Sequence, residues 1–420
     1  MTPDMELDME ELNKRRVERH LRRQQMNAQK KKKKTLAMVL VCLLLIALGA
    51  GVFFLLRMDE QTEPEREFVT QSGDVAAEDD TVIHLVAAGD VNVSDAIVAS
   101  GGADYDYTDT FLDVAHLLAE GDITVLNLEG NLCGSPYGTN SHSAPQSLAE
   151  MLSRSGVDLV QLANSYSINQ GISGLQATIQ GVKDAGMEPL GVYADERAYK
   201  AGKGYTIREV EGVKIAFVAF TKGMDGMTLP QGSENCVNVL YSDYDSTYQD
   251  INSKAINAVL DAVEEEKPDL TVAMLHWGSE YNDTISKTQK SIVSLMQERG
   301  VDAIIGTHPH YVQQMDYDPE TGNFVAYSLG DLISDGQRSG TEYSVILKLE
   351  ITKSGDSTKI TGYSYTPVFT VAERGKTLRS VRVAETMAAY DRNYLKSVTE
   401  TTYNAMIYAL QRIDSRIKGE

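Results

Sequence analysis

The stretch "VDAIIGTHPH", from Val301 to His310, joins a short β-branched apolar run to two histidines that stand one residue apart. Such a run predicts a buried strand, and successive side chains of a strand alternate between its faces. His308 and His310 would therefore point to the same side if the backbone stays extended through Pro309, and proline favours that extension in the residue before it. Two imidazoles on one side indicate a metal site, and two hydrogen-bonded histidines in a loop are the alternative.

The pattern around this stretch repeats along the chain, because apolar runs alternate with amphipathic segments that often end in glycine. Strands are predicted at residues 82–88, 123–128, 157–163, 213–220, 269–276, 301–306 and 324–330. Helices are predicted at residues 108–121, 144–156, 172–186, 252–267 and 286–300. This alternation favours an α/β fold with a largely buried sheet. Antiparallel strands are predicted at 341–352 and 359–371, followed by a helical tail at 388–420.

The charge of the chain is unevenly distributed. The formal net charge is −21 over 420 residues. Residues 1–34 carry 11 Lys and Arg against 6 Asp and Glu, whereas residues 58–420 carry 27 basic and 54 acidic side chains. A domain this acidic is a poor nucleic-acid binder, because phosphate contacts need Lys and Arg. We therefore expect no nucleic-acid partner and a soluble, acidic main domain.

The segment from Thr35 to Leu56 has 22 residues without a charge, which is enough to cross a bilayer as a helix. Lys30 to Lys34 directly precede it, so the positive-inside rule predicts a cytoplasmic N-terminus and an extracytoplasmic main domain. A cleaved signal peptide is the alternative, but the apolar run exceeds the usual length of such a peptide's apolar region. The cell membrane is thus one predicted partner.

These observations predict five segments. They are a basic cytoplasmic tail at 1–34, a transmembrane signal anchor at 35–56, an acidic linker at 57–80, the main domain at 81–385 and the helical tail at 386–420. Cys133 and Cys236 would both lie on the extracytoplasmic side, where a disulfide is allowed, but the sequence does not show whether they are neighbours.

Chemically useful side chains follow several predicted strands. In α/β sheets, ligands bind outside the carboxyl ends of the strands. One Asp, one Glu and three His stand there, namely Asp90, Glu129, His276, His308 and His310. Each of these residues also has an ordinary explanation without a metal, as a turn residue, a solvated carboxylate or a packed histidine. Their coincidence at successive strand ends favours a metal site, and the mixed N/O set suits Mn, Zn or Fe.

The motifs "GDVNVSD", "NLEG", "LANSYSINQG", "HWGSEY", "GTHPHYVQQ" and "YSLGDLI" occur in this order between about Val82 and Ser334. Together they resemble the CapA family of capsule or poly-γ-glutamate biosynthesis proteins, which have a calcineurin-like metallophosphoesterase fold. The resemblance implies a four-layer α/β/β/α sandwich with one or two divalent metal ions (Mn, Fe or Zn) at the strand ends. It implies the metal ligands Asp90, Asn92, Glu129, His276, His308 and His310, with Glu129 where the fold's bridging carboxylate stands.

The sequence departs from the family pattern after the third strand, where the family has Asn-Asn-His followed by Asp. Here Asn164 is kept, a ligating Asn is replaced by Ser165, and the residue implied as general acid is Tyr166. The resemblance thus places Asn164 and Tyr166 in the catalytic motif, but a tyrosine with a pKa near 10 is a poor acid at neutral pH. Asp331 also replaces the family's Asn. We therefore expect the ligands of the first metal ion to be intact, whereas the ligands of the second metal ion and the proton donor are partly lost.

Three functions remain open at this stage. The first is a membrane-anchored envelope protein that assists synthesis or export of an anionic capsule polymer such as poly-γ-glutamate, with membrane proteins of polymer synthesis or export as partners. The second is a metal-dependent phosphoesterase-type hydrolase. The third is a non-catalytic domain that binds the polymer or a partner through an eroded metal site. We expect the first, with catalysis left open.

Overall fold

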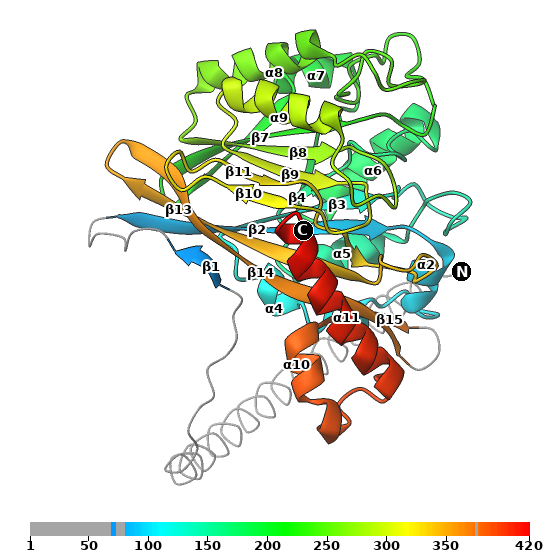
Figure 1. The fold of residues 1–420 in the computed structure, drawn as a ribbon. Helices are drawn as coiled ribbons and strands as arrows, with labels where there is room; N and C mark the ends of the chain where they lie inside the picture. Colours follow the sequence, from blue (N-terminus) through cyan, green and yellow to red (C-terminus); the bar gives the residue numbers. More distant parts are fainter. Residues whose placement is uncertain (1–68, 73–79, 374–376) are drawn as a thin grey trace, which may run out of the picture. The chain divides into compact units, whose positions relative to one another are not determined.

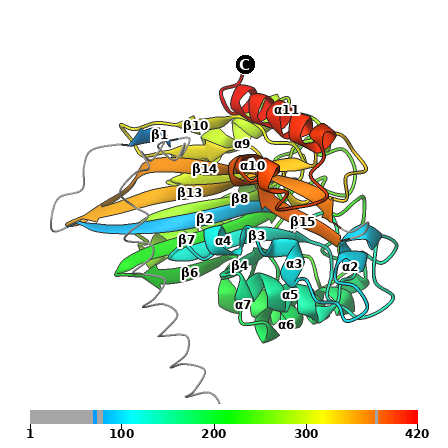
Figure 2. The same ribbon diagram turned by 90° about the horizontal axis from the view of Figure 1, so that it is seen from below.

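The computed structural model describes residues 69–72, 80–373 and 377–420, which belong to one compact unit. The predicted anchor at 35–56 lies outside these residues. Within the described part, no helix combines the length and apolar character that a membrane crossing needs. Figure 1 shows the fold, and Figure 2 shows the same ribbon seen from below.

Two sheets form the centre of the protein. The first has nine strands: β1 (Val69–Ser72), β14 (Ser357–Glu373), β13 (Tyr343–Ser354), β2 (Thr81–Asn92), β3 (Ile123–Glu129), β4 (Leu159–Gln161) and β5 (Glu188–Leu190) in order, with β12 (Asp331–Ile333) beside β2 and β15 (Thr377–Arg382) beside β14. The second has six strands in the order β10 (Met315–Tyr317), β11 (Phe324–Ala326), β9 (Ala303–Thr307), β8 (Leu270–His276), β7 (Val213–Thr221) and β6 (Tyr205–Val210).

Helices cover the outer faces of the two sheets (Figure 1). On the first sheet lie α2 (Asp95–Ser100), α3 (Thr108–Phe111), α4 (Ala115–Leu118), α5 (Gln146–Arg154) and α6 (Gly171–Asp184). On the second lie α8 (Ser253–Glu266) and α9 (Lys287–Glu298). The short helix α7 (Glu196–Gly202) buries no residue. The layers are therefore helix, sheet, sheet and helix, so the predicted four-layer sandwich is confirmed.

The layering follows from strands that are apolar on both faces. In β7, Ile215 and Phe217 join the core between the two sheets, whereas Val218 and Phe220 pack under α8 and α9. The helices begin at ordinary signals, as α9 does at Ser286, whose hydroxyl accepts from the Gln289 backbone N–H while the Gln289 side chain accepts in return.

The predicted helix at 108–121 is wrong in detail, because the structure has two short helices there, α3 and α4. Between them lies Asp113, whose carboxylate accepts hydrogen bonds from the side chains of Arg379 and Tyr394. These contacts with residues far along the chain stabilise a turn at Asp113, so the helix is interrupted there although the local sequence favours a continuous one. The predicted strand at 324–330 is likewise shorter, because β11 ends at Ala326 and the chain goes on to β12.

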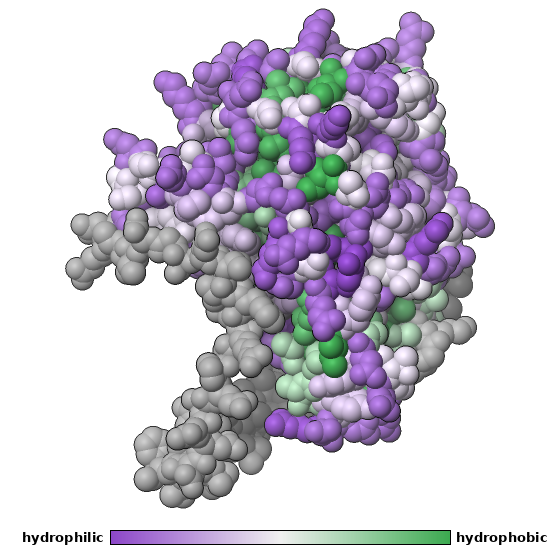
Figure 3. All heavy atoms as spheres, in the orientation of Figure 1, coloured by the Kyte–Doolittle hydropathy of each residue, from purple (hydrophilic) through white to green (hydrophobic). Residues whose placement is uncertain are grey.

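The C-terminal segment forms α10 (Val383–Ala388), a 3-10 turn at Tyr390–Arg392 and α11 (Glu400–Ile417). The predicted helical tail is present, and Met406, Ala409, Ile413 and Ile417 of α11 are buried in the same core as the inter-sheet residues. Figure 1 shows α11 in red across β14. Hydrophilic side chains cover most of the face drawn in Figure 3, and apolar ones form only scattered groups.

Candidate metal centre

The carboxyl ends of strands from both sheets meet at one edge of the sandwich. β2 and β3 run parallel with Asn92 opposite Glu129, and β12 runs parallel to β2 with Asp331 opposite Asp90. In the second sheet, β8 and β9 run parallel with His276 opposite Thr307. This pairing brings the carboxyl ends of four predicted strands and the first residue of β12 to the same region, as expected for a ligand site in an α/β sheet.

Two adjacent groups of candidate ligands lie at this edge. Glu129, His276 and His308 form one group, and Asp90, His310 and Asp331 form the other. Within each group, one ligand atom from each residue lies within 4.8 Å of the others. All six side chains are buried. We call these the Glu129 group and the Asp90 group.

The two histidines of the "THPH" turn belong to different groups, which corrects the expectation that they point to the same place. The backbone does not stay extended, because His308 has φ 92° and His310 has φ 59°. Both values lie in the left-handed region, which non-glycine residues seldom adopt. The ring centroids are 6.2 Å apart as a result. One short turn thus supplies a ligand to each group, and backbone strain of this kind is concentrated at functional sites.

In the Asp90 group, Nδ1 of His310 lies 2.9 Å from Oδ1 of Asp331 and 3.9 Å from Oδ2 of Asp90. The same nitrogen is 3.2 Å from Nδ2 of Asn92, so Asn92 stands beside the group. The backbone N–H of His308 donates to Oδ2 of Asp90 at 3.1 Å, which ties the turn to β2. Of the predicted ligands, this group contains Asp90 and His310, and Asp331 is added to them.

In the Glu129 group, Oε1 of Glu129 lies 3.3 Å from Nε2 of His276. The hydroxyl of Ser165, which stands in the position of a lost ligand, is 3.0 Å from that nitrogen and 3.5 Å from Nδ1 of His308. Among the described residues, Oε2 of Glu129 and Nε2 of His308 are buried without any hydrogen-bond partner. The Glu129 group, which lies beside the position of the lost ligand, therefore keeps three candidate ligands. Two of them, Glu129 and His308, have a buried atom without a hydrogen-bond partner among the described residues.

A second layer of polar side chains orients the ligands. The hydroxyl of Thr307 donates to Gln161 and lies 3.2 Å from Nδ1 of His276, and the backbone N–H of Ser165 donates to Nε2 of the same ring at 3.2 Å. Asn127 donates to Asp90, and Asn164 donates to Asn127 at 3.1 Å. Asn164 is thus fully buried behind Asp90. Its catalytic role stays a prediction.

Tyr166, the other residue predicted to be catalytic, is partly exposed and stacks on His142 with ring centroids 3.5 Å apart and an interplanar angle of 11°. Burial, followed by the negative charge of Glu129, raises the pKa of the Tyr166 phenol well above its ordinary value. The phenol therefore keeps its proton at neutral pH. Whether it takes part in catalysis stays a prediction.

The electrostatics of the two groups fit a bound cation. Burial, followed by Glu129, raises the pKa of Asp90 to about 6, and burial raises that of Asp331 to about 7. Burial, followed by His276 and Lys222, holds the pKa of His308 well below its ordinary value, so its ring is neutral and can ligate. Three buried carboxylates side by side need positive charge to offset their repulsion and desolvation. A divalent ion, held by neutral imidazoles and carboxylates, supplies it.

Metal uptake by the Asp90 group is expected to strengthen as the pH rises. Burial alone would lower the pKa of His310, but the Asp331 carboxylate outweighs it and raises that pKa well above its ordinary value. The metal must displace this proton, and below about pH 7 also the proton that Asp331 holds. Apparent affinity should rise by about tenfold or more from pH 6 to pH 8, with proton release. Chelator competition with Mn²⁺, and calorimetry in two buffers, measure both.

A His310→Ala chain is the control for this titration, because its Asp90 group lacks the imidazole proton that the metal displaces. Its residual affinity should depend less steeply on pH. A pH-independent affinity of the unaltered chain would contradict the assignment of that proton.

Some residues at this edge escaped the sequence reasoning. Asp331 follows the predicted strand at 324–330 as directly as the other ligands follow theirs, but it is not among the predicted ligands. Lys222 directly follows β7 and belongs to no recognisable motif, and its backbone N–H donates to the His276 carbonyl at 2.7 Å. Tyr281 stacks on the His310 ring at 5.1 Å and has no pattern that would reveal it. Cys133 and Cys236 are both free thiols.

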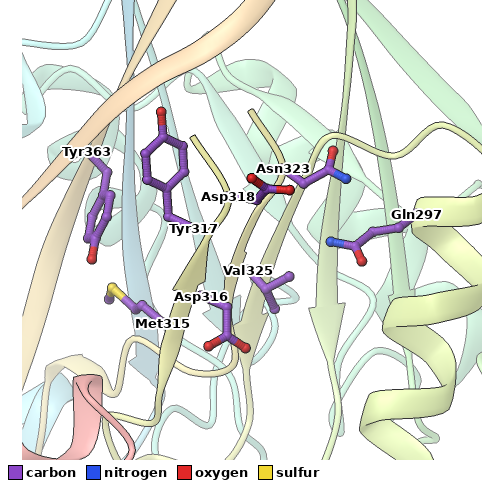
Figure 4. Close-up of a pocket in the computed structure, with 8 residues that line it drawn as sticks. All are labelled: Gln297, Met315, Asp316, Tyr317, Asp318, Asn323, Val325 and Tyr363. Carbon is purple, nitrogen blue, oxygen red and sulfur yellow. The ribbon is translucent and has the colours of Figure 1, made fainter. Parts of the chain in front are cut away.

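A separate pocket of about 480 Å³ lies elsewhere (Figure 4). In this view Tyr317, Tyr363 and Met315 stand on one side and Gln297 and Asn323 on the other. The pocket adjoins the amino end of β11, which runs parallel to β9, so it lies toward the opposite end of the second sheet from the ligand groups. None of its lining residues belongs to either group.

Comparison with known proteins agrees with the motif order. The family model described as "Bacterial capsule synthesis protein PGA_cap" matches residues 84–336. The chain is 27% identical over 216 residues to the capsule biosynthesis protein CapA of Bacillus anthracis, covering 51% of this chain and 49% of that protein. It is 26% identical over 202 residues to the PGA biosynthesis protein CapA of Bacillus subtilis (strain 168), covering 46% and 47%. The chain thus spans about half the length of the curated relatives it matches.

Among solved structures, the chain is similar to the calcineurin-like phosphoesterase YfkN of Bacillus subtilis, with a TM-score of 0.42 and 15% identity over 80% of this chain and 98% of that one. The family match covers more than half of the chain, from the first site strand to just beyond β12. The resemblance drawn from the motifs is confirmed, and this protein belongs to the bacterial capsule synthesis protein PGA_cap family.

Proposed function

We propose that this protein assists the synthesis or export of an anionic capsule polymer such as poly-γ-glutamate, and that it does so through its metal centre. The observation that carries the proposal is the pair of buried ligand groups inside a domain of this family. Relatives named for capsule and PGA biosynthesis support the choice of polymer. Buried ligand atoms without hydrogen-bond partners destabilise the folded state, and a domain that only scaffolds other proteins gains nothing from them. Their presence therefore favours a functional metal site.

The proposed centre holds two divalent ions, one in each group. The Asp90 group would hold one through Asp90, His310 and Asp331, with Asn92 beside them. The Glu129 group would hold the other through Glu129, His276 and His308. The mixed N/O donors support Mn, Fe or Zn. When bound, such ions polarise a carbonyl or phosphoryl oxygen of the substrate, whereas the chain's own residues position and orient it.

The proposed location is the outer side of the cell membrane. The uncharged segment at 35–56 and the lysines before it support a single-pass anchor with a cytoplasmic N-terminus. Membrane proteins of polymer synthesis or export are the proposed partners, because an anchored domain would meet the polymer where it leaves the membrane. Protease accessibility of the main domain on intact cells, compared with lysed cells, tests this location.

Polymer production should depend on the ligand groups. In a host strain without the gene, the unaltered chain should restore the polymer, whereas the double variant Asp90→Asn with Glu129→Gln should leave it reduced by about tenfold or more. His116→Gln is the matched control, because His116 is exposed on α4 and belongs to neither group. Cell-bound and released polymer are measured by acid hydrolysis and amino-acid analysis, with protein levels checked by immunoblot. Full restoration by the double variant would contradict the proposal.

A metal-dependent phosphoesterase-type hydrolase is the second candidate. It is favoured by the adjacency of the two groups, since paired metal sites are common in phosphatases and nucleases. The raised pKa of Tyr166, caused first by burial, argues that this phenol is a weak proton donor. The full chain, loaded with Mn²⁺ or Zn²⁺, should be assayed on phosphomonoesters, phosphodiesters and γ-linked glutamate oligomers. Turnover that Glu129→Gln abolishes would establish this candidate, and absence of turnover on all three would remove it.

A further inference from the structure

Two cations stand at the metal centre without a salt bridge to a carboxylate among the described residues, although the domain is strongly acidic and the negative charge of Glu280 acts on Lys222. The ammonium of Lys222 donates to the Gly278 carbonyl at 2.9 Å and lies 4.6 Å from the centroid of the Tyr248 ring. Among the described residues, the ammonium donates no other hydrogen bond. Lys222 directly follows β7, and its backbone N–H donates to the His276 carbonyl. The charge of its side chain acts on His308, so the ammonium stands beside the Glu129 group.

The second cation lies at the other half of the centre. The guanidinium of Arg338 lies 4.7 Å from the centroid of the Tyr281 ring, and that ring stacks on His310 at 5.1 Å with an interplanar angle of 25°. Arg338 is exposed, and Tyr281 is 38% exposed, so both are accessible from solvent. An arginine in contact with an aromatic face keeps its donors free for a ligand while its position is fixed.

The loop that carries Tyr281 is held in place from two sides. The Tyr281 backbone N–H donates to the Pro309 carbonyl at 2.9 Å, which links it to the turn between the two ligand histidines. Two residues on, Asp283 accepts from Arg412 and Arg416 of α11, both at 3.2 Å. The position of Arg338 relative to His310 is therefore set by the fold, since the aromatic ring between them is anchored to both the turn and the C-terminal helix.

We propose that Lys222 and Arg338 bind carboxylates of an anionic chain that runs across the metal centre, one on each side of it. This inference rests on the proposed function and names the ligand as an oligomer with carboxylates spaced along its length. The acidic domain as a whole repels such a ligand, so local unpaired cations are needed for it to approach. With a lysine beside one ligand group and an arginine beside the other, an extended polyanion is favoured over a small one, because it engages both cations at once.

Equilibrium binding of a fluorescent γ-linked glutamate oligomer to the Mn²⁺-loaded full chain tests this inference by anisotropy at low and moderate salt. Lys222→Gln and Arg338→Gln should each weaken binding about fivefold and the double variant about twentyfold, with a shallower salt dependence. Glutamine keeps a donor for the Gly278 carbonyl. Metal content and the unfolding midpoint should not change, because neither residue belongs to a ligand group.

Lys290→Gln is the matched control, because Lys290 is exposed on α9 and forms no ion pair among the described residues. An oligomer whose side carboxylates are amidated is the matched ligand, and it should bind at least tenfold more weakly to the unaltered chain. If the unaltered chain binds the oligomer and the double variant binds it equally, the inference is wrong while the proposed function stands. If no oligomer binds the loaded chain, both the inference and the choice of polymer fail. Much tighter binding of tripolyphosphate than of the oligomer would overturn the assignment to carboxylates.

Discussion

Gly89→Ala is expected to destabilise the fold by about 3 kcal/mol or more and to empty the Asp90 group of metal. A Cβ at position 89 would lie 1.7 Å from the Gly330 carbonyl oxygen and 2.8 Å from its carbon. Both are backbone atoms, so no side-chain rotation relieves the clash. The Asp90 N–H donates to the same carbonyl at 3.0 Å. The substitution therefore pushes β12 away from β2 and separates Asp331 from Asp90.

Urea unfolding followed by circular dichroism measures the first effect, and elemental analysis of the purified chain measures the second. Gly202→Ala is the control, because Gly202 ends the helix α7 and the nearest atom to its added Cβ is a Tyr193 ring carbon at 3.1 Å, which can shift. Its stability should stay within about 1 kcal/mol of the unaltered chain. An unchanged unfolding midpoint for Gly89→Ala would show that β2 and β12 are not packed this closely.

Single substitutions should empty one ligand group at a time. His276→Ala removes one of three candidate ligands from the Glu129 group, and His310→Ala removes one from the Asp90 group. Each variant is expected to retain one metal ion where the unaltered chain holds two, and the double variant should retain none, because a group left with two ligands binds far more weakly. Elemental mass spectrometry of the full chain, purified without chelator and incubated with Mn²⁺, gives the ratio per chain.

His116→Gln serves again as the control and should retain both ions. Thermal unfolding with and without added Mn²⁺ gives an independent readout, because an ion that binds only the folded state raises the midpoint. The single variants should lose part of this increase and the double variant all of it. If His276→Ala alone empties both groups, the ions are not held independently. If the unaltered chain takes up no metal under any condition, the two-ion centre is wrong.

Periodicity and strand ends predict much of this architecture from the sequence. Residues 213–220 and 269–276 are apolar on both faces, which is typical of strands between two layers, and β7 and β8 lie within a residue of those bounds. Asp90, Glu129 and His276 end such strands, so the general rule for α/β sheets is sufficient to bring them together. The arrangement of two sheets, in contrast, came from the resemblance, because periodicity does not say which strands share a sheet.

The remaining features depend on contacts that no local pattern encodes. The split of His308 and His310 follows from the positive φ angles of these two residues, on either side of Pro309, which the prediction of an extended backbone excluded. The strands β5 and β12 have three residues each, too few for a periodic signal, yet β12 carries Asp331. Lys222 and Arg338 were missed because an isolated basic residue has no signature until its neighbours are known.

The pairing of β12 with β2 also has a consequence for how the molecule is made. Asp90 and Asp331 are opposite each other in the sheet, although most of the described part of the chain separates them in sequence. During synthesis the Asp90 group cannot be completed until Asp331 has left the ribosome, so a shortened product lacks it. Contacts between such distant residues form slowly, because a long loop must close first. Metal loading of that group therefore reports only on chains that have been extended beyond Asp331.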